Sequence, residues 1–195
     1  MSTDRKILIL AGEASGDAHA ADLVRNWIVK SPDDQFCGTA GEKMVSAGVE
    51  SLCSVDKMAV VGFSETIQKL PFMFRLAKTI KQWTIQNKPD VLILVDFPGF
   101  NLRMAKRLRK FVPQIWYFIT PQVWAWGSGR VATIQKYVDH CFVLFQFEKD
   151  FFDRANIPCT WMGHPLIDNL GERDSLRDST EEKKNLVFFP GSRTS

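Results

Sequence analysis

Short, continuous runs of apolar residues alternate with helical patterns along residues 1–170 of this chain. Val91–Val95 is the clearest of these runs, and residues 6–11 and 114–119 have the same character. Such runs are typical of strands that are buried on both faces of a parallel sheet. The regular alternation therefore predicts an α/β fold, in which a Rossmann-like, doubly wound parallel sheet carries helices on both faces.

The other expected elements continue this alternation. Further strands are expected at residues 35–38, 49–53, 140–145 and 159–162. Helices are expected at residues 18–30, near 42–47, and at 64–87, 101–110 and 148–155. Pro71 is expected to interrupt the helix at 64–87, because proline lacks the backbone N–H that a helix interior requires.

The chain is expected to contain one complete domain and the start of another. The pattern predicts a domain at 1–170, a charged linker at 171–184, and the first strand and turn of a second, truncated domain at 185–195. That last segment contains the turn Pro190, Gly191, Ser192 and Arg193. A guanidinium beside small residues suits a clamp for a diphosphate, and an ordinary surface turn explains the motif equally well.

Composition narrows the classes of function. The hydrophobic fraction of 45% is ample for a buried core, and the net charge of +3 is too small to indicate a nucleic-acid partner. The four cysteines lack Cys-x-x-Cys spacing, so we expect reduced thiols in the cytoplasm and no zinc site. The apolar run near the N-terminus is too short for a signal peptide, and no run is long enough to span a membrane.

In a doubly wound sheet, ligands bind at the loops that follow the carboxyl ends of the strands. The first such loop combines small and acidic residues, namely Gly12, Glu13, Ser15, Gly16 and Asp17. Its glycines let a ligand approach the backbone amides, and its acids favour sugar hydroxyls over a phosphate. The alternative is a structural turn in which Ser15 or Asp17 caps the following helix.

The second loop follows Val91–Val95 and begins with Asp96. An aspartate at the end of a buried central strand is poorly solvated, which raises its pKa and suits a general base acting on a hydroxyl. A carboxylate bonded to neighbouring amides at the start of a helix is an equally good interpretation. Asn101 is a candidate for substrate binding and also a candidate cap of the next helix.

Two further loops carry aromatic and imidazole groups. The loop after residue 119 contains Gln122, Trp124 and Trp126, whose indole rings stack on sugars, cover acyl chains or simply pack beneath the loop. His164 follows the last expected strand and is the best placed of the three histidines. No pair of histidines has metal-ligand spacing, so we expect no catalytic metal, and a structural role stays open for each histidine.

A separate apolar patch is expected on the helix at 64–87. It consists of Phe72, Met73 and Phe74 and is flanked by basic residues, and Phe74 falls off the stripe that is expected to face the core. Exposed aromatic residues among cations suit contact with a membrane interface or an acyl chain. Packing of the patch against the sheet is the alternative.

Taken together, these motifs resemble those of the lipid-A-disaccharide synthases, which are bacterial glycosyltransferases of the two-domain GT-B fold. The matching segments are 11–17 (AGEASGD), the Gly38/Gly41/Met44/Gly48 pattern, 59–65 (AVVGFSE), 88–91 (KPDV), 96–101 (DFPGFN), 121–126 (PQVWAW), 147–148 (FE), 163–165 (GHP) with Asp168, and 190–193 (PGSR). No single segment is decisive, but the ordered set is highly specific. The resemblance implies that residues 1–170 are the N-terminal, acceptor-side domain of a GT-B fold.

The resemblance also implies a reaction. Members of the family transfer 2,3-diacylglucosamine from its UDP derivative to the 6-hydroxyl of 2,3-diacylglucosamine 1-phosphate, with inversion, release of UDP and no metal or other cofactor. Asp96 would be the catalytic base, and Arg193 would stabilise the departing diphosphate together with Ser192. Because most of the donor-side domain is not in this sequence, we expect no transfer by this polypeptide alone, and a companion chain carrying that domain is a candidate partner.

The same resemblance implies a peripheral protein at the inner face of the cytoplasmic membrane, with residues 70–81 near acylated substrates. Three other functions stay open on the sequence. The first is a module that binds acylated sugar phosphates without catalysis. The others are a GT-B transferase that acts on peptidoglycan precursors, and an interaction protein of the membrane surface.

Overall fold

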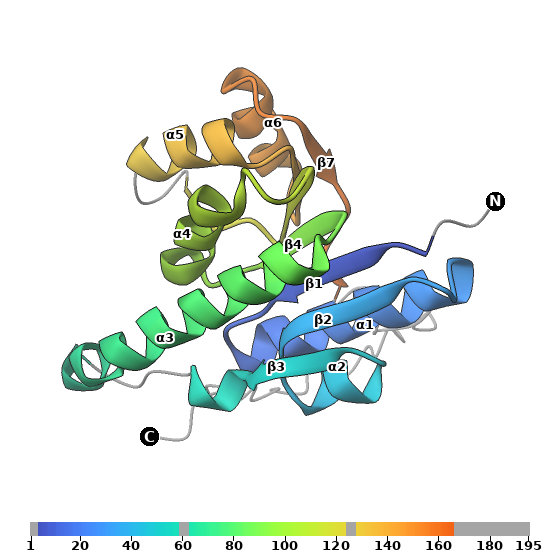
Figure 1. Ribbon diagram of the computed structural model, residues 1–195. Helices are drawn as coiled ribbons and strands as arrows, with labels where there is room; N and C mark the ends of the chain where they lie inside the picture. Colours follow the sequence, from blue (N-terminus) through green and yellow to red (C-terminus); the bar gives the residue numbers. More distant parts are fainter. Residues whose placement is uncertain (1–3, 59–62, 124–127, 166–195) are drawn as a thin grey trace, which may run out of the picture. The chain divides into compact units, whose positions relative to one another are not determined.

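The computed structural model describes residues 4–58, 63–123 and 128–165. These residues form a seven-stranded, all-parallel sheet with the order β3-β2-β1-β4-β5-β6-β7 (Figure 1). The strands are β1 (Lys6–Leu10), β2 (Gln35–Ala40), β3 (Glu50–Ser54), β4 (Val91–Val95), β5 (Gln114–Phe118), β6 (His140–Val143) and β7 (Cys159–Trp161). The helices are α1 (Ala14–Lys30), α2 (Glu42–Ser46), η1 (Val55–Lys57), α3 (Phe63–Asn87), α4 (Pro98–Leu108), α5 (Ser128–Tyr137) and α6 (Gln146–Arg154).

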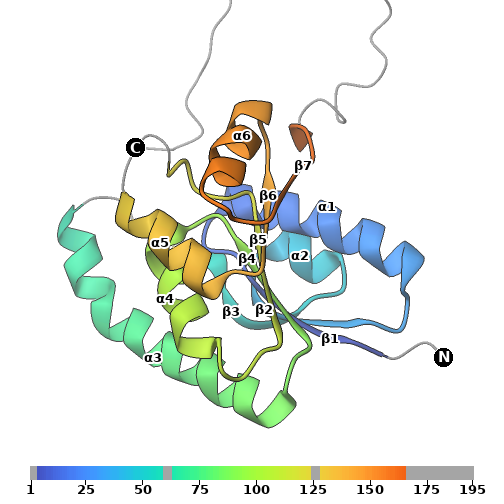
Figure 2. The same ribbon diagram turned by 90° about the horizontal axis from the view of Figure 1, so that it is seen from above.

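Helices cover both faces of the sheet, because successive residues of a strand point to opposite faces. Ile7 and Ile9 of β1 belong to a buried cluster with α1 and α2, whereas Leu8 and Leu10 belong to a second cluster with α3 and α4. Figure 2 shows α1 and α2 on one side of the sheet and α3, α4 and α5 on the other. The predicted doubly wound α/β fold is therefore confirmed.

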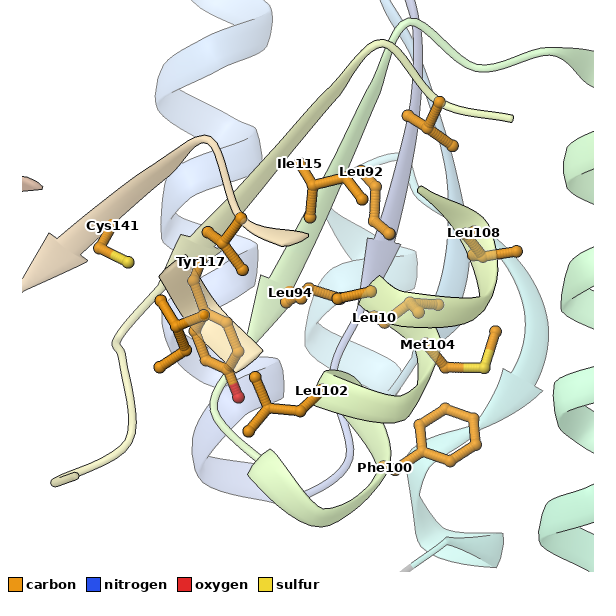
Figure 3. Close-up of a cluster of buried hydrophobic side chains, with 14 of the residues drawn as sticks. Leu10, Leu92, Leu94, Phe100, Leu102, Met104, Leu108, Ile115, Tyr117 and Cys141 are labelled. Atoms are coloured by element: carbon orange, nitrogen blue, oxygen red, sulfur yellow. The ribbon is translucent and has the colours of Figure 1, made fainter. Parts of the chain in front are cut away.

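The second cluster, part of which is drawn in Figure 3, includes residues of β4, β5 and α4 as well as Leu10 of β1 and Cys141 of β6. Leu92 and Leu94 of β4 are fully buried there, as is Tyr117 of β5. Burial of one such aliphatic side chain stabilises a fold by about 1.5–3 kcal/mol. Figure 3 places the hydroxyl oxygen of Tyr117 toward Leu102, in the first turns of α4.

The direction of the chain reverses between β1 and β4. From β1 the chain proceeds outward to β2 and β3, and α3 then carries it back to β4 on the other side of β1. From β4 it proceeds outward in the opposite direction through β5, β6 and β7. This reversal makes the carboxyl ends of β1 and β4 the topological switch point, which is where open α/β sheets bind ligands.

The seven predicted strands are all present, but several predicted helix boundaries were wrong. The helix expected at residue 18 begins at Ala14, because Glu13 is its N-cap and accepts the N–H of Asp17 at 2.9 Å. The helix expected at Asn101 begins at Pro98, since proline is well suited to the first helical turn. Helix α5 was not predicted at all.

The predicted interruption at Pro71 was also wrong. Helix α3 runs without a break from Phe63 to Asn87, with Pro71 inside it. Pro71 is exposed, so the helix accommodates the proline on its solvent side, without the backbone hydrogen bond that proline cannot donate. Leu76, Ala77 and Ile80, which follow the proline, are buried and anchor the helix to the sheet.

The predicted linker at 171–184 and the predicted strand and turn at 185–195 lie outside the described residues, so both stay predictions. Within the part of the chain that the structure describes, none of the helices has the length and apolar character needed to cross a membrane. All four cysteines lie in that part and are free thiols.

Candidate active site

The loops that follow β1 and β4 are in direct contact at the switch point. A Cβ atom on Gly12 would lie 2.2 Å from Cγ of Phe97, which is closer than side-chain carbons approach. A Cβ atom on Gly16 would lie 3.6 Å from Cγ1 of Val95, an ordinary contact distance. Glycine at position 12 therefore allows the loop that begins with Asp96 to pack against the loop after β1.

Asp96 lies in a strained backbone turn. Asp96 and Phe97 have φ angles of 44° and 47°, in the left-handed region that residues other than glycine rarely adopt. Each such residue costs roughly 1–3 kcal/mol and persists only where its surroundings hold it. At the end of the neighbouring strand β5, Ile119 is also left-handed, with a φ of 58°. Lys88 and Asn156 are also left-handed and lie elsewhere, but the two consecutive left-handed residues, Asp96 and Phe97, are at the switch point. Strain of this kind often occurs at functional sites.

The carboxyl group of Asp96 is half-buried, and its pKa is raised above the ordinary value because burial penalises the charged form. A hydrogen bond from the backbone N–H of Phe97 and the charge of His19 oppose this shift but do not cancel it. A carboxylate with a raised pKa is a better proton acceptor, which is what a general base for a hydroxyl requires. An amide therefore binds this carboxylate, as the second interpretation from the sequence expects, and the role of Asp96 as a base stays a prediction.

His19 belongs to the same cluster. It lies one turn after Gly16 on α1, is half-buried, and interacts electrostatically with Asp96 and His164. Burial lowers the pKa of His19, and the charge of His164 acts in the same direction, whereas the charges of Asp22 and Asp96 oppose this shift. On the sequence, His164 was the better candidate for a site residue, because it follows an expected strand and His19 does not. The missed signal was the spacing of three residues from Gly16, which places His19 on the same side of α1.

Asp17 has a structural role. Its carboxylate accepts the backbone N–H groups of Gly41 at 2.7 Å, Lys43 at 3.1 Å and Met44 at 3.1 Å, all at the start of α2. Only 5% of Asp17 is exposed. The suggestion that Asp17 caps its own helix was wrong, since it satisfies the free amides of the next helix. Both carboxylate oxygens accept backbone amides, so contact of Asp17 with a substrate stays a prediction without support from the structure.

Sequence comparison places the chain among known proteins. The lipid-A-disaccharide synthetase family matches residues 7–195. The chain is 41% identical to the lipid-A-disaccharide synthase of Geobacter sulfurreducens in an alignment of 198 positions that covers 98% of this chain and 52% of that protein. It is 36% identical to the synthases of Myxococcus xanthus and Coxiella burnetii, covering 99% and 98% of this chain and 52% of each relative.

The chain belongs to the lipid-A-disaccharide synthetase family. The resemblance inferred from the ordered motifs is thereby confirmed. The chain spans about half the length of the curated relatives that it matches.

Other predicted site residues of this family member occupy varied positions. Asn101 is buried inside α4 rather than at its N-cap, which is Phe97, so the capping interpretation was wrong. Its side-chain Oδ1 has no hydrogen-bond partner among the described residues. Gln122 is exposed in the loop after β5, and the ring of His164 lies 5.8 Å from that of Phe145.

The loop after β1 presents its predicted residues unequally. Gly12 and Gly16 are buried, Glu13 is half-buried and Ser15 is exposed. Their contact with a substrate stays a prediction. Trp124 and Trp126, and with them Ser192 and Arg193, lie outside the described residues.

The predicted apolar patch lies on α3. Phe72 and Met73 are half-buried against the core, which supports the packing interpretation for these two residues, whereas 61% of Phe74 is exposed. A groove beside Phe74 is lined by apolar and basic side chains of α3 and α4, namely Leu70, Met73, Phe74, Ala77, Phe100, Arg103, Met104 and Arg107. Among the described residues, no histidine, cysteine and carboxylate side chains are grouped as metal ligands would be.

Proposed function

We propose that this chain provides the acceptor-side domain of a lipid-A-disaccharide synthase. The reaction transfers 2,3-diacylglucosamine from UDP to the 6-hydroxyl of 2,3-diacylglucosamine 1-phosphate and yields the disaccharide 1-phosphate and UDP. The observation that carries this proposal is Asp96, a half-buried carboxyl with a raised pKa at the switch point of the sheet. Membership of the family and the ordered motifs support it.

In the proposed mechanism, Asp96 accepts the proton of the 6-hydroxyl as that oxygen attacks the anomeric carbon of the donor sugar. The new glycosidic C–O bond forms while the bond to UDP breaks on the opposite side of the sugar, so the configuration inverts. The developing negative charge leaves with the diphosphate. Arg193 is proposed to stabilise that charge, as the motif comparison implies.

The loop after β1 is proposed to hold the acceptor sugar. Glu13 would accept hydrogen bonds from sugar hydroxyls, and Ser15 would accept or donate them. Gly12 and Gly16 would keep the backbone of this loop close to Asp96. Gln122, His164 and Asn101 are further proposed contacts of the substrate. Trp124 and Trp126 are proposed to stack on the sugar or cover an acyl chain.

The acyl chains of the substrate require an apolar surface. Phe74 and the groove beside it supply exposed apolar area next to Arg103 and Arg107, which suits an acylated anion. We propose that Phe72, Met73 and Phe74 face acyl chains or the inner face of the cytoplasmic membrane, where the protein would act peripherally. A companion polypeptide that supplies the donor-side domain is a proposed partner.

The test compares acceptor binding with and without acyl chains. Calorimetry of the purified chain in detergent micelles should show at least about tenfold tighter binding of 2,3-diacylglucosamine 1-phosphate than of glucosamine 1-phosphate, since buried CH₂ groups contribute about 0.8 kcal/mol each. Phe74→Ser should reduce this preference. Val29→Ser is the matched control, because Val29 is an apolar residue of α1 that is 84% exposed.

Equal affinity for the two acceptors would remove the lipid A proposal and favour a transferase for non-acylated sugars. Turnover is tested by adding the part of the Geobacter sulfurreducens synthase that this chain does not cover, together with both substrates. Binding without turnover in that mixture would favour the binding module.

A further inference from the structure

The backbone at Asp96 needs an external restraint. Asp96 and Phe97 are consecutive left-handed residues, and neither is glycine. The turn begins at the carboxyl end of β4. Beyond this point the chain is no longer hydrogen-bonded to both β1 and β5 as a strand. The N–H of Asp96 does reach the carbonyl of Phe118 on β5, but at 3.3 Å this is a long hydrogen bond.

The restraint acts on the carbonyl oxygen of Asp96. This oxygen accepts Nδ2 of Asn101 at 2.7 Å and the hydroxyl of Tyr117 at 2.8 Å. The two donors come from different elements, since Asn101 lies on α4 and Tyr117 on β5. Both donor residues are 1% exposed or less, so the donor side of each bond is shielded from water.

Asn101 extends this restraint to the neighbouring strand. Its Nδ2 also reaches the carbonyl of Val95 at 3.1 Å and that of Leu10, at the end of β1, at 3.2 Å. One side-chain amide therefore links the ends of both strands that form the switch point. Tyr117 adds the third strand, because its ring is packed in the core cluster of β4, β5 and α4.

The phenol of Tyr117 also interacts electrostatically with the carboxyl group of Asp96, the first residue of this turn. Burial raises the pKa of Tyr117 well above its ordinary value, and the negative charge of Asp96 raises it further. The carboxylate is therefore near the phenol, although the hydroxyl donates its proton to the carbonyl and not to the carboxylate. His19 is the other titratable group that acts on Asp96.

We propose that Tyr117 and Asn101 are positioning residues for Asp96, which hold its carbonyl oxygen and thereby keep the strained turn that places the carboxyl group at the switch point. The proposal rests on the proposed function, because Asp96 is the base in that function. Neither residue needs to touch the substrate in this role.

Tyr117→Phe tests the proposal with the smallest change. The substitution keeps the buried ring and removes one hydroxyl, and Asn101 still holds the carbonyl oxygen. Tyr137→Phe is the matched control, because the chain has only two tyrosines and Tyr137 lies on α5, away from this turn. Thermal unfolding of both variants verifies that each is folded at the assay temperature.

The first measurement needs no substrate. The carboxyl group of Asp96 is titrated by ¹³C NMR in the purified chain, with Asp96→Asn to assign its resonance. Without the hydroxyl the turn relaxes and the carboxyl gains water, so its pKa should be lower in Tyr117→Phe than in Tyr137→Phe. Equal values in the two variants would overturn the proposal.

The second measurement is turnover in the presence of the uncovered part of the Geobacter sulfurreducens synthase. Tyr117→Phe should lower kcat about 10- to 100-fold, the effect of a small misplacement of a catalytic group, and leave KM for the acceptor within about twofold. A kcat equal to that of Tyr137→Phe would overturn the positioning role. If Asp96→Asn keeps full turnover, Asp96 is not the base and the proposed function fails. The titration of Asp96 in Tyr117→Phe would still test whether Tyr117 holds the turn.

Discussion

The ends of β1 and β4 are neighbours in the sheet, and an aspartate lies near each of them. Asp17 is in the first turn of α1, the helix after β1, whereas Asp96 directly follows β4, and the two acids have different surroundings. Asp17, after β1, gives both carboxylate oxygens to three backbone amides at the start of α2. Asp96, after β4, has one backbone amide at its carboxylate, and burial raises its pKa. The strand-end position alone therefore does not make a catalytic acid or base.

The difference lies in what solvates each charge after folding. The amides at the start of α2 replace water around the carboxylate of Asp17. At Asp96 the protein removes water and returns little in exchange, which leaves a carboxylate with affinity for a proton. The hydrogen bonds at the second site go to the backbone carbonyl of Asp96, and they fix its position without neutralising its charge.

The largest expected effect is the loss of turnover in Asp96→Asn. The amide has nearly the same shape but cannot take a proton, so transfer in the reconstituted assay should fall about 10²- to 10⁴-fold, the usual contribution of a general base. Acceptor affinity measured by calorimetry should change little. Asp56→Asn, at an exposed acid of η1, is the control and should keep full turnover.

The next largest effect is expected on stability, from Asp17→Ala. This variant leaves three amides at the start of α2 without their acceptor, and it should lower the free energy of unfolding by roughly 2–4 kcal/mol. Urea unfolding at pH 7 measures the change. Asp22→Ala removes only an exposed ion pair with Arg25 and should stay within about 1 kcal/mol of the parent. Similar losses in the two variants would contradict the structural role of Asp17.

Gly12→Ala tests the contact between the two loops. Its Cβ would meet the ring of Phe97, 2.2 Å from Cγ, so the left-handed turn must shift, with an expected destabilisation of about 1–3 kcal/mol. Turnover should fall as well, because Asp96 moves with Phe97. In Gly99→Ala the new Cβ has nothing within 4 Å, and this variant should match the parent in urea unfolding and in rate.

The smallest expected effect is a gain in stability for Asp96→Asn. The raised pKa of Asp96 means that the folded state holds its proton more tightly than the unfolded state, so stability falls as pH rises from the ordinary aspartate pKa of about 4 through the folded value. Asparagine carries no such penalty. The variant should therefore be more stable than the parent at pH 7, and this difference should disappear below about pH 4. Urea midpoints at both pH values measure it.

The sequence predicted the centre of the sheet well because β1, β4 and β5 are local apolar runs, and no partner is needed to recognise them. It also placed Asp96, since the end of a central strand can be counted from Val91–Val95. The role of Asp17 could not be predicted, because its partners lie 24 to 27 residues away and are backbone amides, which every residue possesses.

Tyr117 was missed for a related reason. On the sequence it is one of several apolar positions of β5, and only the fold brings its hydroxyl to a carbonyl 21 residues away. The early start of α1 was obscured by Ser15 and Gly16, which favour loops when tertiary contacts are ignored. Pro71 misled the prediction because its effect depends on which face of α3 is exposed.

The most direct test of the central claim is the titration of Asp96 by ¹³C NMR in the unmodified chain. We predict a midpoint above that of an ordinary aspartate. Burial raises the pKa of Asp96 by more than the amide of Phe97 and the charge of His19 lower it. A midpoint at or below the ordinary value would mean that the Asp96 carboxylate is solvated or paired, and Asp96 would lose its place as the base.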